Sequence, residues 1–493
     1  MSVITIIGSG FSGLSAAAYL SAAGHEVHVF EKNAEAGGRA RQITTPEGYV
    51  FDMGPSWYWM PGVFEKFFAD FGHTASEFYD LKLLDPSFEM VFGKNDSISV
   101  PADFTALCEM FDTIEPNSSD RLIKFMKEAE VKYRIGMEKF VYQPSLSFAE
   151  FLSTEILMNV MQLNLLSSHH KHLRKYFSDP RLLALMEFPV LFLGGTSEKI
   201  PALYTLMNYA GLKLGTWYPM GGFGKVIEAM KNIAEENGAR FHFNANVDKI
   251  QTRDQLATSL MVDGSSISTD GIIAAADYEH VENNLLPVEC KNYKNGYWKH
   301  KVFAPSCLIF YLGINKPIER LLHHTLFFDE SLDQHGKEIY DHPMWPTKPL
   351  FYVCCPSKTD PDVAPVGHEN IFMLMPIATG LNDTDEIRER YFEIMMDRLE
   401  SFCGTSIRAH IAYKRSYCIN DFKGDYNSFN GNAYGLANTL KQTAILRPKI
   451  SNSKINNLFY AGQLTIPGPG VPPAIISGKI AAGLLNKSLI KAR

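Results

Sequence analysis

Residues 3–32 read VITIIGSGFSGLSAAAYLSAAGHEVHVFEK, and this stretch decides which fold the chain adopts. The β-branched run at 3–7 is typical of a buried parallel strand. The Ala- and Leu-rich residues that follow predict a helix, and Gly24 suits its C-terminal cap. A second β-branched run then ends at Glu31. A strand, a glycine turn, a helix and a strand in this order predict an α/β, Rossmann-like domain at the start of the chain.

The glycines between the first strand and the helix have the spacing of a phosphate-binding turn. Gly8 permits a tight turn, Gly10 lets a pyrophosphate approach the backbone, and Gly13 lets the helix pack closely on the strand. Glu31 follows Gly13 by 18 residues, close to the distance expected of an acid that binds a ribose hydroxyl. Ser12 and Lys32, which neighbour these residues, are also assigned to the cofactor site.

A second glycine element distinguishes between the dinucleotides NAD and FAD. Both carry an adenosine ribose, so Glu31 fits either of them. Gly37, Gly38 and Arg39 follow the acid and add a second close approach to the pyrophosphate, with a guanidinium as its charge partner. This arrangement is typical of an FAD site, and FAD is therefore the predicted cofactor.

The end of the chain has a similar order of a strand, a glycine-containing loop and a helix. Residues 456–462 predict a strand that ends in glycine, and residues 466–473 read IPGPGVPP before a helix at about 473–486. Prolines fix φ, and a proline near the first helical position suits a helix start. A positive helix end beside a flavin would stabilise the negative charge that gathers on its pyrimidine ring on reduction. The flavin-binding residues predicted here are Gly462, Gln463, Pro467, Gly468, Gly470, Val471 and Pro472.

Two internal segments complete the predicted cofactor site. Residues 49–61 read YVFDMGPSWYWMP, with a Gly-Pro turn after a strand-like run. The aromatic residues 57–59 either contact the flavin or form a packed aromatic cluster. Residues 216–253 return to α/β character, with a glycine-rich helix entry and a strand pair at 239–250, where by analogy one backbone group contacts adenine. The residues assigned to the site are Gly54, Pro55, Ser56, Trp57 and Val247.

Composition changes along the chain predict two discontinuous domains. The first insertion is rich in helical periodicity and large apolar side chains, and the second mixes strands with one charged amphipathic helix near 384–402. The FAD-binding domain is expected to comprise residues 1–79, 211–300 and 441–493. A mixed α+β substrate domain, formed by the insertions, is expected to comprise residues 80–210 and 301–440.

Composition and charge exclude several classes of function. The formal net charge of −7 argues against a nucleic-acid partner. Seven cysteines without CxxC spacing predict no disulfide framework, and Cys354 and Cys355 are interpreted as ordinary core or strand residues. The first apolar stretch lacks a basic start, so we interpret it as structure rather than as a signal peptide. Apolar runs of the ~18 residues that a membrane span needs are also missing from the sequence.

The two ends of the chain together resemble the bacterial phytoene desaturase family of FAD-dependent carotenoid desaturases. The matching motifs are the first glycine turn, GGRA, FDMGPSWYW, YPMGGFGK and NLFYAGQLTIPGPGVPPAIISGK. APSCLIFYLGIN and YGLANTLKQTAILRP also fit, so the likeness runs through most of the chain. Gln463 departs from the wider flavoprotein pattern, in which an Asp often stands at this place. The resemblance implies an amine-oxidase-like fold that acts on a long acyclic carotenoid.

The resemblance also implies a reaction. Successive dehydrogenations would convert phytoene, an acyclic C40 carotenoid, to lycopene, and this is the predicted activity. A hydride would leave an allylic carbon for flavin N5, a proton would leave the adjacent carbon, and oxygen or a quinone would reoxidise the flavin. Since no residue pair in the sequence identifies a base, the catalytic residues stay unknown.

Three other interpretations of the function stay open. The first is a 1-hydroxycarotenoid 3,4-desaturase. The second is an amine or protoporphyrinogen oxidase on the same fold, although the long apolar insertions argue against it. The third is a non-enzymatic carrier of prenyl lipids, against which the intact glycine turns and Glu31 argue.

An insoluble substrate requires a membrane contact. HHKHLRKYF at 169–177 follows the apolar stretch 151–166, and this combination suits an interfacial segment, with a solvated charged helix as the alternative. We therefore expect a cytoplasmic protein peripheral to the cytoplasmic membrane face. His169, His170 and His172 lack companion ligands, so no metal is expected.

Overall fold

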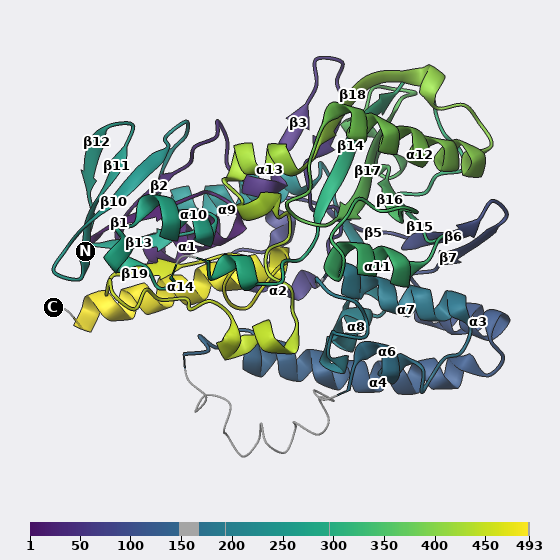
Figure 1. The fold of residues 1–493 in the computed structure, drawn as a ribbon, viewed down its shortest axis with the longest axis horizontal. Helices are drawn as coiled ribbons and strands as arrows, with labels where there is room; N and C mark the ends of the chain where they lie inside the picture. The colour runs from purple at the N-terminus through teal and green to yellow at the C-terminus, as the bar shows by residue number, and fades with distance from the viewer. Residues whose placement is uncertain (147–166, 193, 295, 492–493) are drawn as a thin grey trace.

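The computed structural model describes the whole chain except residues 147–166, 193, 295 and 492–493. Both termini lie in one half of the molecule, beside a parallel sheet, and a larger sheet with its own helices fills the other half (Figure 1). This is the α/β class with a mixed α+β part that the sequence predicts. The apolar stretch 151–166, a predicted wall of the substrate site, lies outside the described residues.

A five-stranded sheet forms the half of the molecule that holds the termini. Its strands are β1 (Val3–Ile7), β2 (Glu26–Phe30), β9 (Arg240–His242), β13 (Gly271–Ala274) and β19 (Leu458–Tyr460). Their order is β19–β13–β1–β2–β9, and every neighbouring pair is parallel. The first strand of the chain therefore lies at the centre, between strands from the middle and the end of the sequence. The glycine turn that follows β1 is thus at the middle of one edge of the sheet.

Helices from three parts of the sequence cover one face of this sheet. They are α1 (Phe11–Ala22), α9 (Phe223–Glu236) and α14 (Val471–Lys491). At Gly478, where α14 crosses α1, an added Cβ would lie 2.2 Å from the carbonyl oxygen of Ser12. Ser15 Oγ donates to the carbonyl of Ile475 at 2.7 Å across the same contact. A glycine thus brings the first and last helices into backbone contact.

An antiparallel meander covers the other face, and here one prediction was wrong. The meander consists of β10 (Val247–Arg253), β11 (Leu256–Val262) and β12 (Ser265–Ser268). Residues 239–250 were expected to form a strand pair, but β9 joins the parallel sheet and β10 joins the meander. Asn244, with a φ of 51°, lies in the connection that redirects the chain. Two short strands next to each other in sequence belong to different layers, which their local pattern does not reveal.

A seven-stranded sheet forms the other half. Its order is β18–β14–β17–β16–β15–β6–β7. The pair β15–β6 is parallel and the other pairs are antiparallel. Both predicted insertions contribute strands, while the domain boundaries themselves stay a prediction. The bounds are β6 (Phe88–Gly93), β7 (Asp96–Val100), β14 (Ser306–Ile314), β15 (His324–Phe327), β16 (Phe351–Cys354), β17 (Glu369–Ile377) and β18 (Ile411–Tyr417).

Helices below this sheet come from the first insertion, as its periodicity predicts. They are α3 (Phe104–Ile114), α4 (Ser118–Ile135), α6 (His169–Leu173), α7 (Pro180–Phe192) and α8 (Leu206–Leu212). Among the described helices, none combines the length and the apolar character needed to cross a bilayer.

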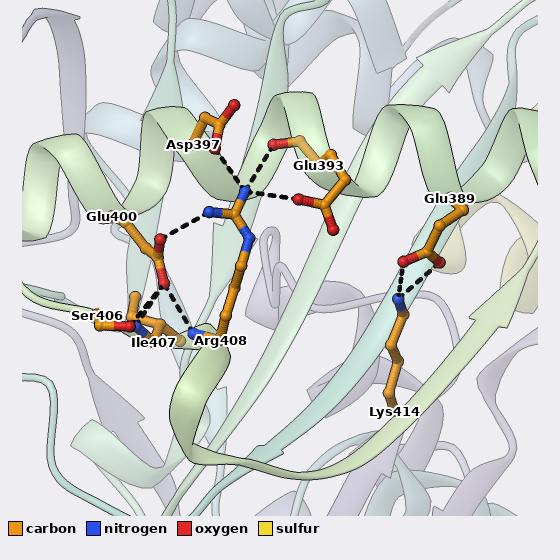
Figure 2. Close-up of polar contacts among 8 residues, drawn as sticks. All are labelled: Glu389, Glu393, Asp397, Glu400, Ser406, Ile407, Arg408 and Lys414. Carbon is orange, nitrogen blue, oxygen red and sulfur yellow. Dashed lines mark hydrogen bonds and ion pairs between the residues drawn. The ribbon is translucent and has the colours of Figure 1, made fainter.

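The predicted charged helix is α12 (Asp385–Cys403), which lies over the seven-stranded sheet (Figure 1). Figure 2 shows how ion pairs hold its polar side to the chain that follows. Arg408 binds Glu393 at 3.0 Å, Asp397 at 2.6 Å and Glu400 at 2.8 Å. The guanidinium of Arg408 therefore carries a positive charge that three carboxylates compensate.

We predict that Gly478→Ala lowers the unfolding midpoint, because its methyl group would overlap the Ser12 carbonyl and separate α14 from α1. Overpacking of this kind costs ~1–3 kcal/mol. The matched control is Gly483→Ala in the same helix, where an added Cβ meets nothing within 4 Å. Thermal unfolding followed by circular dichroism would show a lower midpoint for Gly478→Ala alone. Equal midpoints for the two variants would contradict the prediction.

Candidate functional site

A cavity of about 690 Å³ joins the two halves of the molecule. On one side it is lined by residues at the carboxyl ends of the parallel strands, namely Ile7, Phe30 and Ala275. On the other side it reaches side chains of the seven-stranded sheet, including Ile309 and Leu374. Ligands of open parallel sheets bind at the carboxyl ends of the strands, so this cavity has the expected place for a cofactor site.

Two glycine turns meet at the polar end of this cavity. Gly8 has a φ of 96°, and Gly38 has a φ of 55°. An added Cβ on Gly38 would lie 3.2 Å from the Cα of Gly10, so the turns are in contact. α1 starts here, and its Gly10 cap has no side-chain hydrogen bond to the first amide groups. Backbone N–H donors thus remain available to an anion at a helix N-terminus.

Glu31 lies at the cavity with both carboxylate oxygens engaged. One oxygen accepts the backbone N–H and the hydroxyl of Ser9, both at 2.9 Å. The other accepts the backbone N–H of Asn33 at 2.9 Å and its side-chain amide at 2.8 Å. A carboxylate offers about four acceptor positions. A ribose hydroxyl would therefore replace the Ser9 hydroxyl or the Asn33 amide rather than add to a free carboxylate.

Arg39 is a half-buried cation at the same end of the cavity. Its Nη2 donates to the carbonyl of Asn432 at 3.2 Å. Its Cζ lies over the ring of Tyr426, 5.0 Å from the ring centroid. Its buried Nε has no partner among the residues that the structure describes. Burial lowers the pKa of Arg39, and nearby Asp277 opposes this effect. An unpaired guanidinium donor at the cavity fits the pyrophosphate contact that the sequence predicts.

Asp277 is the polar residue that the sequence analysis missed. Burial raises the pKa of its carboxyl to about 6, while Arg39 acts in the opposite direction. Asp277 follows β13, so it reaches the edge of the sheet where the strands' carboxyl ends gather. A carboxylate directly after a predicted buried strand was the signal that could have indicated it.

The C-terminal loop also lines the cavity. An added Cβ on Gly462 would lie 3.3 Å from Ser12 Oγ, which places this loop against the start of α1. Gln463 donates through its amide to Asn432 at 3.0 Å. α14 begins at Val471, slightly before the predicted start at about 473, because prolines fit the first turn of a helix. The two termini therefore form one cavity wall together.

Most of the predicted binding residues line this cavity, and two do not. Gly13 lies behind the turn, where an added Cβ would come within 2.0 Å of the Gly8 carbonyl, so it serves helix packing. Gly468 lies behind the loop, against Asn438 and Arg447. Those on the wall are Gly8, Gly10, Ser12, Glu31, Lys32, Gly38, Arg39, Gly54, Pro55, Ser56, Trp57, Val247, Gly462, Gln463, Pro467, Gly470, Val471 and Pro472.

Beyond the polar end, the cavity wall is mostly apolar. Trp57 stacks on His324 with ring centroids 4.1 Å apart and an interplanar angle of 11°. Trp57 and Trp59 are 5.4 Å apart in an edge arrangement, so the aromatic residues both line the cavity and form a packed cluster. The two readings of residues 57–59 are thus compatible. The remaining apolar wall includes Met60, Met137, Phe140, Leu206, Met207, Ile309 and Leu374.

A pair of hydrogen-bonded hydroxyl groups lies in this mostly apolar wall. Tyr352 donates to Ser56 Oγ at 3.0 Å, and its hydroxyl lies 2.7 Å from Nδ1 of His324. Burial lowers the pKa of His324 far below its ordinary value, so the imidazole stays neutral. Ser56 was predicted at the site from its motif. Tyr352 lies on a strand almost 300 residues later, and only the fold brings the two together.

The histidines of α6 do not converge on one point. His169 lies 3.3 Å from the amide oxygen of Asn208, and His172 lies 3.4 Å from the ammonium of Lys132. A different group, His323, His324 and Cys354, has possible ligand atoms within 4.8 Å of one another. The expectation that the protein holds no metal stays a prediction.

These residues fit a dinucleotide of the FAD type. The glycine turns leave room for backbone contact with phosphates, Arg39 offers an unpaired donor, and the loop after Gly462 continues the same wall. The apolar extension then provides space for a second, hydrophobic ligand beside the cofactor.

Comparison with known proteins agrees with this geometry. The family model of flavin containing amine oxidoreductases matches residues 11–486. Solved structures similar to the chain include a putrescine oxidase bound to putrescine (TM-score 0.64, 14% identity, 100% of this chain and 99% of that chain). A putative protoporphyrinogen oxidase from Exiguobacterium sp. 255-15 has a TM-score of 0.61 at 14% identity, covering 99% of each chain. At this identity the structures show the shared fold.

Curated relatives are closer in sequence. The chain is 39% identical to a carotenoid 3,4-desaturase of Haloarcula japonica over 99% of this chain and 98% of that protein. It is 28% identical to a zeta-carotene-forming phytoene desaturase of Myxococcus xanthus over 97% of this chain and 92% of that protein. The chain therefore belongs to the flavin-containing amine oxidoreductase family, among its carotenoid desaturases, and is an FAD-dependent oxidoreductase that acts on CH–CH bonds.

Proposed function

We propose that this protein introduces double bonds into an acyclic C40 carotenoid, and that its step is desaturation at the 3,4 position. The observation that carries the general proposal is a single cavity with a dinucleotide cradle at one end and an apolar extension at the other. The relative named as a 3,4-desaturase shares 39% identity, against 28% for the phytoene desaturase, and this difference supports the 3,4 position. Conversion of phytoene to lycopene, the first choice from the sequence, is the second candidate.

The apolar wall accounts for binding of a hydrocarbon. Each methylene-sized unit that leaves water contributes ~0.8 kcal/mol, so a dozen buried units suffice for tight binding without any polar contact. The aromatic side chains of Trp57 and Trp59 add apolar surface to this wall. The Ser56–Tyr352 hydroxyl pair offers a polar contact on this wall.

The protein contributes to the reaction by positioning the substrate and by excluding water. Bound FAD supplies the oxidant, which accepts the hydrogen and electrons removed from the substrate. The cavity holds the polyene against the cofactor site and excludes water from the reacting carbons. Positive charge that develops on an allylic carbon spreads into the polyene, so loss of the neighbouring proton needs no strong base. We assign no catalytic base.

Substrate assays separate the two candidates. We predict that purified holoenzyme converts a 1-hydroxycarotenoid in liposomes to its 3,4-didehydro product and leaves phytoene largely unchanged. Chromatography with absorption spectra measures both reactions, since each new conjugated bond moves the bands to longer wavelength. Conversion of phytoene alone would favour the second candidate. Oxidation of an amine or of protoporphyrinogen, with both carotenoids untouched, would contradict the substrate class.

The polar end of the cavity generates a second prediction. Arg39→Met should weaken FAD binding about 10- to 100-fold, because a charged hydrogen bond contributes ~1.5–3 kcal/mol. The measurement is FAD release followed by flavin fluorescence during dilution. Arg240→Met is the control, since that arginine is exposed and pairs with Glu26 at 3.4 Å. Unchanged FAD affinity in Arg39→Met would remove this residue from the proposed cofactor contacts.

We also propose peripheral membrane association through residues 169–177, with oxygen or a quinone as the electron acceptor. In this segment His169 and His172 are buried, while Lys171 and Lys175 are exposed. Arg174 is committed to Glu187, at 2.6 Å. The two lysines are thus the cations that support contact with an anionic lipid surface, each contributing ~1 kcal/mol.

Liposome flotation tests this contact. Replacing Lys171 and Lys175 with Glu should reduce recovery with anionic vesicles at least tenfold, because two attractions become repulsions. Replacing Lys225, an exposed residue of α9, with Glu serves as the control. Recovery equal to that of the unmodified protein would contradict membrane contact through these two lysines.

A further inference from the structure

Arg447 is a fully buried arginine behind the C-terminal cofactor loop. Its three nitrogens donate five hydrogen bonds, all to uncharged oxygens. Nε binds the carbonyl of Thr465 at 3.0 Å. Nη1 binds Asn438 Oδ1 at 2.6 Å and the Gln442 carbonyl at 3.1 Å, and Nη2 binds the carbonyls of Leu436 at 2.9 Å and Gln463 at 3.3 Å. Every donor position of the guanidinium is therefore used.

The charge of Arg447 is not compensated, unlike that of the ion-paired arginines in the fold. Arg408 in Figure 2 pairs with three carboxylates, and Arg388 pairs with Asp383 and Asp421. Arg447 has no carboxylate within ion-pair distance among residues 1–146, 167–192 and the other described parts of the chain. Its positive charge is solvated by amide dipoles and is not cancelled.

Arg447 remains a cation at neutral pH. Burial lowers its pKa to about 10, which still leaves the guanidinium protonated. A buried charge costs free energy unless it is hydrogen-bonded, so the five acceptors explain how the protein tolerates it. The same low dielectric that makes the charge costly also carries its field into the cavity.

The position of Arg447 connects this field to the cofactor loop. Its acceptors Gln463 and Thr465 line the cavity, and so does Asn438. Gly468 packs directly on the guanidinium, because an added Cβ there would lie 3.3 Å from its Cζ. The guanidinium thus lies one residue layer behind the wall that the cofactor contacts.

We infer that Arg447 is a positioning residue that both holds this loop in place and, through its uncompensated positive charge, favours the reduced, anionic form of the bound flavin. The inference rests on FAD binding in the described cavity and is independent of which carotenoid is the substrate. A fixed cation near a site where negative charge develops stabilises that charge without reorganisation. The carbonyl ligands orient the guanidinium, and no part of it needs to touch the flavin.

Two properties of the holoenzyme measure this effect without substrate. The first is the midpoint potential, obtained by reductive titration against a reference dye. The second is the affinity for sulfite, an anion that adds to flavin N5 and leaves negative charge on the ring. Arg447→Gln should weaken sulfite binding at least tenfold and lower the midpoint by about 30 mV, the equivalent of tenfold for a two-electron couple.

Matched variants separate charge from packing. Arg447→Lys keeps a cation at this place and should restore most of both properties, measured at pH 6 because burial lowers the pKa of a lysine and a lower pH favours its charged form. Arg408→Gln removes a compensated cation in the chain that follows α12 and should change neither property. If Arg447→Gln does not retain flavin, Asn438→Asp tests the same point, because it places a carboxylate on the guanidinium and leaves Arg447 in position.

The outcomes are distinct. Lower potential and weaker sulfite binding in Arg447→Gln or Asn438→Asp, with recovery in Arg447→Lys, support the inference. Unchanged potential and sulfite affinity in these variants would overturn it and leave Arg447 a structural residue of the loop. Equal losses in the Lys and Gln variants would also overturn it, since geometry rather than charge would then govern both properties. Failure of the carotenoid assays would leave these flavin measurements unaffected.

Discussion

The contact between the first helix and the last depends on glycine, because only a residue without a side chain lets the two backbones come this close. Gly478 of α14 packs on the Ser12 carbonyl of α1, and Gly462 packs on the Ser12 side chain. A Cβ at Gly478 would occupy space that the Ser12 carbonyl already fills. Because of this contact, the C-terminal loop lies beside the N-terminal glycine turns. The two ends of the chain together line the cofactor end of the cavity, and segments from the middle of the chain line the rest.

The charges around the cavity are divided between its two ends. At the end with the glycine turns, Arg39 keeps an unpaired donor, and Asp277 lies near enough to affect its pKa. Behind the C-terminal loop, Arg447 binds only amide and carbonyl oxygens. Between them much of the wall is apolar, and the Ser56–Tyr352 pair is one of its polar contacts. A dinucleotide with a charged centre and an electron-accepting ring matches this division, and a hydrocarbon matches the extension beside it.

Local sequence patterns predicted the cofactor-binding motifs well, but they predicted less well which sheet each strand joins. The glycine spacing, Glu31 and the Gly/Pro loop are short-range signals, and the structure brings nearly all of these residues to one cavity. Gly13 and Gly468 lie behind the wall because they serve packing, which sequence spacing does not distinguish from ligand contact. The prediction of a strand pair at 239–250 was wrong because β9 and β10 belong to different sheets. An alternating pattern of apolar residues indicates a strand but does not indicate which strand it pairs with.

The sequence by itself determined the fold class, the cofactor type and the family resemblance, because backbone conformation and phosphate binding depend on residues that are close together in the chain. Tertiary structure alone decided that Tyr352 meets Ser56, that Asp277 faces Arg39, and that Arg447 supports the loop without a counter-ion. These contacts join segments separated by many residues. Their energies depend on burial and on distance in space, which no local spacing in the sequence specifies.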